Sequence, residues 1–129
     1  MDVASLARNQ AVNRVLIGTG LTILPRVFGR VWAGSEADDD RAQVLSRALG
    51  ARDLTLGAAA LLALRDGDPE WVRRMFAAQA FADAVDLAAI AGAGSRLPLG
   101  ARVLGMTMAA GSAAVALAYA AQLSGADAL

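Results

Sequence analysis

The residue types that could carry chemistry in this sequence form two short groups inside otherwise apolar segments. Arg52 and Asp53 stand side by side at the head of a long uncharged stretch. Asp83 and Asp86 are three positions apart, and Gln79 precedes Asp83 by one helical turn. Side chains at this spacing lie on one face of a helix. We therefore expect a helix face that carries two carboxylates and an amide.

Arginine is the natural partner for carboxylates in apolar surroundings. A guanidinium group stays charged when buried and can donate two parallel hydrogen bonds to one carboxylate. Arg52 would lie on the helix that precedes the two acids and runs antiparallel to theirs, with Arg47 as a possible second partner. The sequence thus predicts a buried polar cluster made of Arg47, Arg52, Asp53, Gln79, Asp83 and Asp86.

The role of this polar cluster has three interpretations. In the first, the cluster is a structural device that allows charged groups to be buried together. In the second, it is a site for an ion, a proton or a ligand, because ionisable residues inside a membrane often mark function. In the third, its residues lie at the membrane interface or in water.

The sequence lacks residues that many catalytic reactions need. The sequence contains no cysteine, histidine or lysine. Their absence excludes thiolate nucleophiles, disulfides, histidine ligands for zinc or haem, Schiff bases and lysine-containing phosphate loops. Two carboxylates also supply too few oxygen atoms for a hard metal cation. We therefore expect a protein that is not an enzyme and that uses no cofactor and no metal.

The charge and composition of the chain favour a membrane over a nucleic acid as its partner. Twelve basic residues, all arginine, balance twelve acidic residues, so no net field attracts nucleic acid. Hydrophobic residues make up 57% of the 129 positions, above the roughly 45–50% of soluble domains. The first residues lack the pattern of a secretory signal, so we expect none.

Four helices must position the polar cluster. Apolar spacing is helical or continuous, β-branched residues are sparse, and the breaks coincide with proline and glycine. Pro25 ends or kinks the first helix, and residues 26–32 continue it at an angle. Gly67 can end the second helix, while Asp68 can cap the third and Pro69 can open it. The four expected helices span residues 3–24, 41–65, 69–91 and 98–123.

These helix lengths and short connections predict an all-α fold. We expect a four-helix bundle with up-down-up-down topology that forms a single domain over residues 1–129. Residues 33–41, the most polar stretch, are expected to form a loop whose acids lie at the start of the next helix.

The last helix gives the clearest indication of a membrane. Residues 103–121 contain no charge, and 19 residues at about 1.5 Å each span a hydrocarbon core of ~30 Å. A soluble bundle would carry a charged stripe on such a helix. Asp83 and Asp86 oppose insertion of the third helix, because each would cost about 2.5–3.5 kcal/mol at the bilayer centre. We expect a transmembrane bundle in which these acids face a partner inside the protein.

Small residues recur every four positions on the last two helices, which suits close helix packing in lipid. The alternative is that an alanine-rich composition produces the pattern by chance. The residues concerned are Ala80, Ala84 and Ala88 on one helix and Ala110, Ala114 and Ala118 on the other, beside Gly105, Ala109 and Ala113.

The segment "LGARDLTLG", followed one helix later by "DAVD", resembles a loose group of small, uncharacterised four-helix integral membrane proteins from bacteria. The group shares a GxRD motif on helix two and an acidic residue on helix three. The likeness covers Gly50 to Asp86 and implies a multi-pass protein of the bacterial cell membrane with no catalytic activity. It carries over Arg52, Asp53 and either Asp83 or Asp86.

Three functions fit these observations. The first is a non-enzymatic accessory or assembly subunit, whose partners are membrane lipid and either other membrane subunits or further copies of the chain. The second is a small carrier or channel-like homo-oligomer for an ion, a proton or a solute, which uses Asp83 and Asp86. The third is a soluble helical bundle that binds an apolar ligand.

Overall fold

The protein is all-helical in the computed structural model, which describes residues 2–126, except the side chains of residues 32, 33, 125 and 126. No strand occurs among the described residues, so the predicted all-α class is confirmed. Five α-helices replace the four expected, because the first helical region is divided. They are α1 (Val3–Ile23), α2 (Pro25–Ala33), α3 (Asp40–Asp66), α4 (Pro69–Ala93) and α5 (Leu99–Ala126).

Pro25 separates α1 from α2 as its missing N–H donor predicts. Leu24 leaves the helical conformation between them, with φ −122° and ψ 57°. Phe28 of α2 packs over Gly20 of α1, where a Cβ atom would collide with the ring. The stretch expected as a loop contains the 3₁₀ helix η1 (Gly34–Asp38). A short α2 therefore folds back beside the end of α1.

The turn between α3 and α4 follows the sequence closely. Gly67 takes the left-handed conformation, with φ 81°. Asp68 caps α4 by accepting a hydrogen bond from the backbone N–H of Glu70 at 2.9 Å, and Pro69 opens the helix. Asp2 caps α1 in the same way, and the hydrogen bond from the Ser5 backbone N–H lowers the pKa of its carboxyl group.

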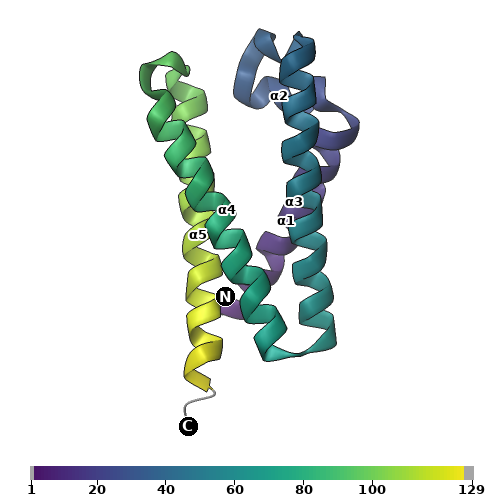
Figure 1. Ribbon diagram of the computed structural model, residues 1–129, viewed down its shortest axis with the longest axis vertical. Helices are drawn as coiled ribbons and strands as arrows, with labels where there is room; N and C mark the ends of the chain where they lie inside the picture. The colour runs from purple at the N-terminus through teal and green to yellow at the C-terminus, as the bar shows by residue number, and fades with distance from the viewer. Residues whose placement is uncertain (1, 127–129) are drawn as a thin grey trace.

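The long helices form two antiparallel pairs (Figure 1). In one pair α1 packs along α3, and in the other α4 packs along α5. The pairs meet at the end that carries the turn from α3 to α4. They separate toward the end that carries α2 and the 3₁₀ helix η2 (Gly94–Arg96). Successive long helices alternate in direction, but the two pairs diverge along their length.

Glycine residues allow α1 and α3 to approach each other closely. A Cβ atom on Gly18 would lie 2.7 Å from the carbonyl oxygen of Gly50. A Cβ atom on Gly57 would lie 2.7 Å from the carbonyl oxygen of Ala11. No side chain fits at these distances, so the backbones of α1 and α3 touch directly. Of the predicted small residues, Ala80, Gly105 and Ala109 are buried and Ala113 is half-buried. The exposed ones are Ala84, Ala88, Ala110, Ala114 and Ala118.

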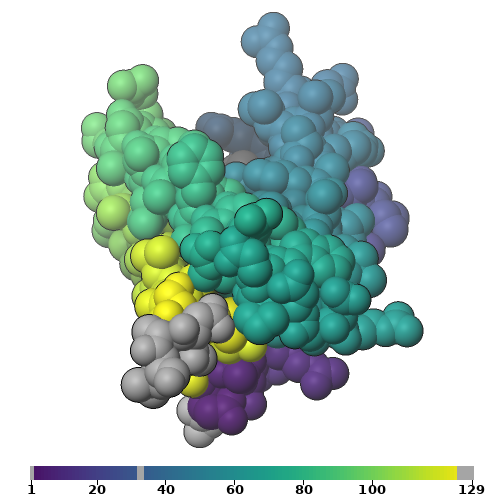
Figure 2. Space-filling view, turned by 60° about the horizontal axis from the view of Figure 1, so that its bottom comes forward, coloured from purple at the N-terminus to yellow at the C-terminus, as the bar shows by residue number. Residues whose placement is uncertain are grey.

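The apolar core is small and lies at the end where the two helix pairs meet, which we call the closed end. Phe76 of α4 is fully buried there among alanines of α1 and α3. Its ring meets that of Tyr119 on α5 edge to face, with centroids 5.1 Å apart. Seen from this end, α3, α4, the beginning of α1 and the end of α5 gather into one mass, while the far ends of the pairs stand apart (Figure 2).

Much of the outer surface is apolar. Two stretches, Pro69–Arg96 and Leu99–Ser124, are long and apolar enough to cross a membrane. Of the apolar window in each, only 22% and 11% of the residues are buried within the protein. Large exposed apolar side chains also occur on the other pair, among them Leu16, Ile23, Val27, Val44 and Leu45.

Candidate binding site

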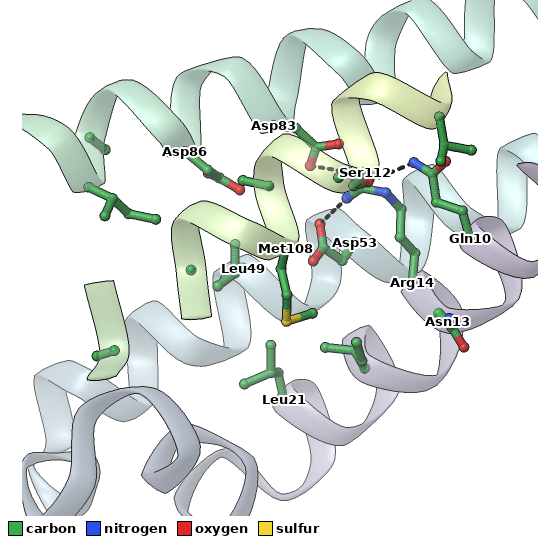
Figure 3. Close-up of a pocket in the computed structure, with 18 of the residues that line it drawn as sticks. Gln10, Asn13, Arg14, Leu21, Leu49, Asp53, Asp83, Asp86, Met108 and Ser112 are labelled. Atoms are coloured by element: carbon green, nitrogen blue, oxygen red, sulfur yellow. Dashed lines mark hydrogen bonds and ion pairs between the residues drawn. The ribbon is translucent and has the colours of Figure 1, made fainter. Parts of the chain in front are cut away.

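An arginine of the first helix occupies the centre of the polar residues. Arg14 of α1 is only 7% exposed. Its guanidinium group donates hydrogen bonds to Asp53 Oδ1 at 2.8 Å, to Asp83 Oδ1 and to Ser112 Oγ at 3.1 Å. These partners belong to α3, α4 and α5, so Arg14 connects all four long helices (Figure 3). The two carboxylates offset the charge of this buried guanidinium group, and the serine hydroxyl accepts a further hydrogen bond.

Arg52 makes the second set of ion pairs. Its Nη1 and Nη2 atoms donate to the two carboxylate oxygens of Asp86 at 2.8 and 2.7 Å, which is the forked geometry expected for arginine. Nη2 also donates to Asp53 Oδ1 at 3.0 Å. Arg52 therefore joins α3 to α4 through Asp86, whereas Asp83 receives Arg14. Asp53 bridges the two arginines, since one of its oxygens accepts hydrogen bonds from both.

Two glutamines extend the network toward the closed end. Gln79 of α4 is fully buried, and its amide donates to the backbone carbonyl of Leu56 at 3.1 Å. Its oxygen accepts a hydrogen bond from Gln10 Nε2 at 3.2 Å. Gln10 also donates to Ser112 Oγ at 2.7 Å. The buried amide of Gln79 thus has partners on both α1 and α3.

Arg47 does not belong to this network, and its inclusion in the predicted cluster is wrong. Its side chain is exposed, and it makes no ion pair or side-chain hydrogen bond with any residue that the structure describes. The reason is helical geometry. Arg47 precedes Arg52 by five positions, which turns it by about 140° around α3 at roughly 100° per residue. The two arginines therefore point in different directions.

Sequence reasoning missed Arg14 because it lies on a different helix from the motif. A signal was present: Gln10, Arg14 and Gly18 follow one another every four positions, which places polar and small residues on one face of α1. This face meets α3 at Gly18 and the polar residues at Arg14. Such a pattern indicates an inward-facing polar stripe, although it does not name the partner.

The cluster carries an unmatched negative charge. Three carboxylates, Asp53, Asp83 and Asp86, face the two guanidinium groups of Arg14 and Arg52. Three buried atoms of the network also have no hydrogen-bond partner among the described residues, namely Asp83 Oδ2, Gln10 Oε1 and Arg14 Nε. Buried polar atoms normally have partners, so these three mark a place where the network is incomplete.

A cavity of about 740 Å³ lies beside the cluster, between the two helix pairs. Arg14, Asp53, Asp83 and Asp86 form its polar wall. Apolar side chains line much of the rest, including Ile17, Leu21, Leu49, Ile90, Met108 and Val115. In Figure 3 Met108 of α5 extends toward Leu21 of α1 across this space. The arrangement can hold a molecule that presents both an apolar surface and a polar group.

The carboxylates are not gathered as a metal site would require. Within residues 2–126 no three acidic, histidine or cysteine side chains lie close enough together to hold a metal ion. Each carboxylate faces a guanidinium group instead of another carboxylate. The three carboxylates are therefore arranged in ion pairs.

Comparison with known proteins adds no relative to this description. No protein-family model, no curated protein and no solved structure matches the chain. The resemblance to small bacterial four-helix membrane proteins, carried by Gly50 to Asp86, therefore stays a prediction.

Proposed function

We propose that this chain is a non-enzymatic integral membrane protein that binds a small molecule between its two helix pairs, as a small carrier does. The observation that carries the proposal is the cavity of about 740 Å³ bordered by buried charged groups. Ligand pockets in proteins typically measure roughly 300–1,000 Å³ and combine apolar walls with a few polar groups. The cavity has both properties, and its walls come from all four long helices.

Exposure of the last two long helices supports the membrane setting. A helix this apolar in a soluble protein would be largely buried, because burial removes its side chains from water. In α4 and α5 only 22% and 11% of the residues in the apolar window are buried. Leu117 on α5 is 58% exposed and Phe81 on α4 is 73% exposed. Lipid around these helices would remove the apolar surface from water.

The inward-facing charges are compatible with such a setting. Isolated aspartates on α4 would oppose insertion, but Asp83 and Asp86 each meet an arginine. In the proposed arrangement α1 and α3 cross the bacterial cell membrane beside α4 and α5 as a multi-pass bundle with alternating directions. Arg14 and Arg52 are then turned away from lipid and toward the acids.

A role as an accessory subunit is the second candidate, and exposed side chains on the other pair favour it. Leu45 of α3 is 70% exposed and Val27 of α2 is 62% exposed. These residues lie outside the two stretches that are long and apolar enough to span a membrane. A protein partner on this side would cover them. In this role the cavity would be filled by a segment of the partner.

Gentle detergent extraction followed by native mass spectrometry tests the proposal. We expect the chain to remain in membranes after alkaline carbonate and to carry a bound small molecule. Met108→Trp, which fills the cavity without altering the charged cluster, should remove that molecule. A stoichiometric protein partner with no small molecule would favour the accessory role. Recovery of the chain in the soluble fraction would contradict the membrane setting that both candidate functions assume.

A further inference from the structure

We infer that the cavity takes an organic monocation with an apolar body, such as a protonated hydrophobic amine, held by its charge against Asp83. The inference rests on the proposed function, because it names the chemical class of the molecule that the cavity binds. It uses two independent features of the site, the unmatched charge of the cluster and the missing hydrogen-bond partner of one buried carboxylate oxygen.

The charge of the cluster favours a single positive charge. Asp53, Asp83 and Asp86 exceed Arg14 and Arg52 by one negative charge. The side chains of Asp53 and Asp83 are only 15% and 5% exposed, and an uncompensated charge in such surroundings is unfavourable. One monovalent cation in the cavity would restore neutrality, whereas an anion would add to the excess. A neutral ligand would leave the excess unchanged.

The position of Asp83 favours a cation that donates hydrogen bonds. The Asp83 side chain is only 5% exposed, and Oδ1 accepts a hydrogen bond from Arg14. Its second oxygen, Oδ2, is buried and has no partner among the described residues. Asp83 lines the cavity, so a ligand there becomes a source of a donor once the carboxylate group turns its buried Oδ2 atom toward the cavity. An ammonium group supplies both the N–H donor and the charge.

The remaining walls favour an organic cation over a metal ion. Metal cations such as Ca²⁺ require about six to eight oxygen ligands, and the described acidic residues do not form such a group. Ile17, Leu21 and Met108 line the same space. They would contact the hydrocarbon part of a ligand while its charged end meets Asp83. The cavity volume leaves room for that body.

Three compounds that share one apolar cage but differ in charge provide the test. They are 1-aminoadamantane, which is cationic at neutral pH, 1-adamantanol, which is neutral, and adamantane-1-carboxylate, which is anionic. We expect calorimetry on the detergent-solubilised full chain to give the tightest binding for the amine. The alcohol should bind at least about tenfold more weakly, which corresponds to about 1.4 kcal/mol, and the carboxylate should not bind measurably.

Variants then assign the charge preference to Asp83. Asp83→Asn keeps the shape of the side chain and removes its charge, so the amine should lose at least about tenfold in affinity while the alcohol changes little. Met108→Trp should abolish binding of both compounds by filling the cavity. Asp66→Asn is the matched control, because Asp66 is exposed at the end of α3 and outside the cavity. It should leave both affinities unchanged.

The outcomes separate failure of this inference from failure of the proposed function. Equal binding of the amine, the alcohol and the carboxylate, all lost in Met108→Trp, would overturn the cation preference and leave small-molecule binding intact. Absence of binding for all three compounds, with no bound molecule in native mass spectrometry, would overturn both. If Asp83→Asn fails to fold, binding of the three compounds to the unaltered chain and to Met108→Trp still shows whether the cavity prefers a cation.

Discussion

Arg14 of α1 and Asp83 of α4, 69 positions apart in the sequence, form an ion pair that is 7% and 3% exposed at its two ends. This contact joins the two helix pairs. Arg14 also contacts Asp53 and Ser112, so its removal would leave Asp83 without its ion-pair partner and Asp53 with Arg52 alone. The arginine that organises the polar residues therefore lies outside the motif that first indicated them.

Arg14→Ala should strongly destabilise the protein. Removing one member of a buried ion pair leaves an uncompensated charge, with a typical loss of about 3–5 kcal/mol. Thermal unfolding in detergent, followed by circular dichroism, would measure the effect. Arg47→Ala is the control, because Arg47 is exposed and should change the stability by less than about 0.5 kcal/mol. Equal stability of the two variants would show that Arg14 is not a structural centre.

Arg52→Gln should have a smaller effect than Arg14→Ala. Arg52 and Asp86 are each 31% exposed, so water and salt screen their attraction. We expect a loss of about 1 kcal/mol in the free energy of unfolding. A double-mutant cycle with Asp86→Asn would isolate the pair, and the coupling should weaken as salt rises. A coupling energy between Arg52 and Asp86 as large as the loss of stability in Arg14→Ala would contradict the expectation that Arg52 contributes less than Arg14.

Gly18→Ala should separate α1 from α3. The new Cβ atom would lie 2.7 Å from the Gly50 carbonyl oxygen, and backbone on both sides leaves little room to adjust. Overpacking of this kind costs about 1–3 kcal/mol. Gly92→Ala in α4 is the matched control, since a Cβ atom there meets nothing within 4 Å. The control should be neutral or more stable by about 0.5–1 kcal/mol, because alanine favours the helix.

Leu117→Asp distinguishes a lipid-facing surface from a water-facing one. Leu117 is 58% exposed in the middle of α5, so in water an aspartate would be tolerated there. In lipid it should oppose insertion by about 2.5–3.5 kcal/mol. The membrane-integrated yield should fall accordingly, whereas Ser95→Asp in η2, outside the helices, should leave it unchanged. Normal yield and solubility of Leu117→Asp would argue against the proposed membrane setting.

Local signals predicted the helices and the turns between them. The left-handed Gly67, the capping Asp68 and the opening Pro69 act within a few residues, so their conformations follow from the sequence. Pro25 likewise marked the break after α1. The extra helix α2 was expected as an angled continuation because nothing local fixed its direction. That direction depends on the contact between Phe28 and Gly20.

The sequence also indicated part of the polar cluster. The spacing of Asp83 and Asp86 and the nearness of Arg52 in the chain pointed to a contact between successive helices, and Arg52 does meet Asp86. Helix period alone should have excluded Arg47. Arg14 and Ser112 are 98 positions apart, and no local preference links residues at such a distance.

The sequence by itself determined an all-helical chain, the positions of its main breaks and a set of charges in apolar surroundings, because backbone preference and helical periodicity act over neighbouring residues. Only the tertiary structure decided that α1 pairs with α3 and α4 with α5. That choice depends on how closely backbones approach at Gly18 and Gly50 and on which acids lie within reach of Arg14. These are contacts between distant segments, and they also produce the cavity between the pairs.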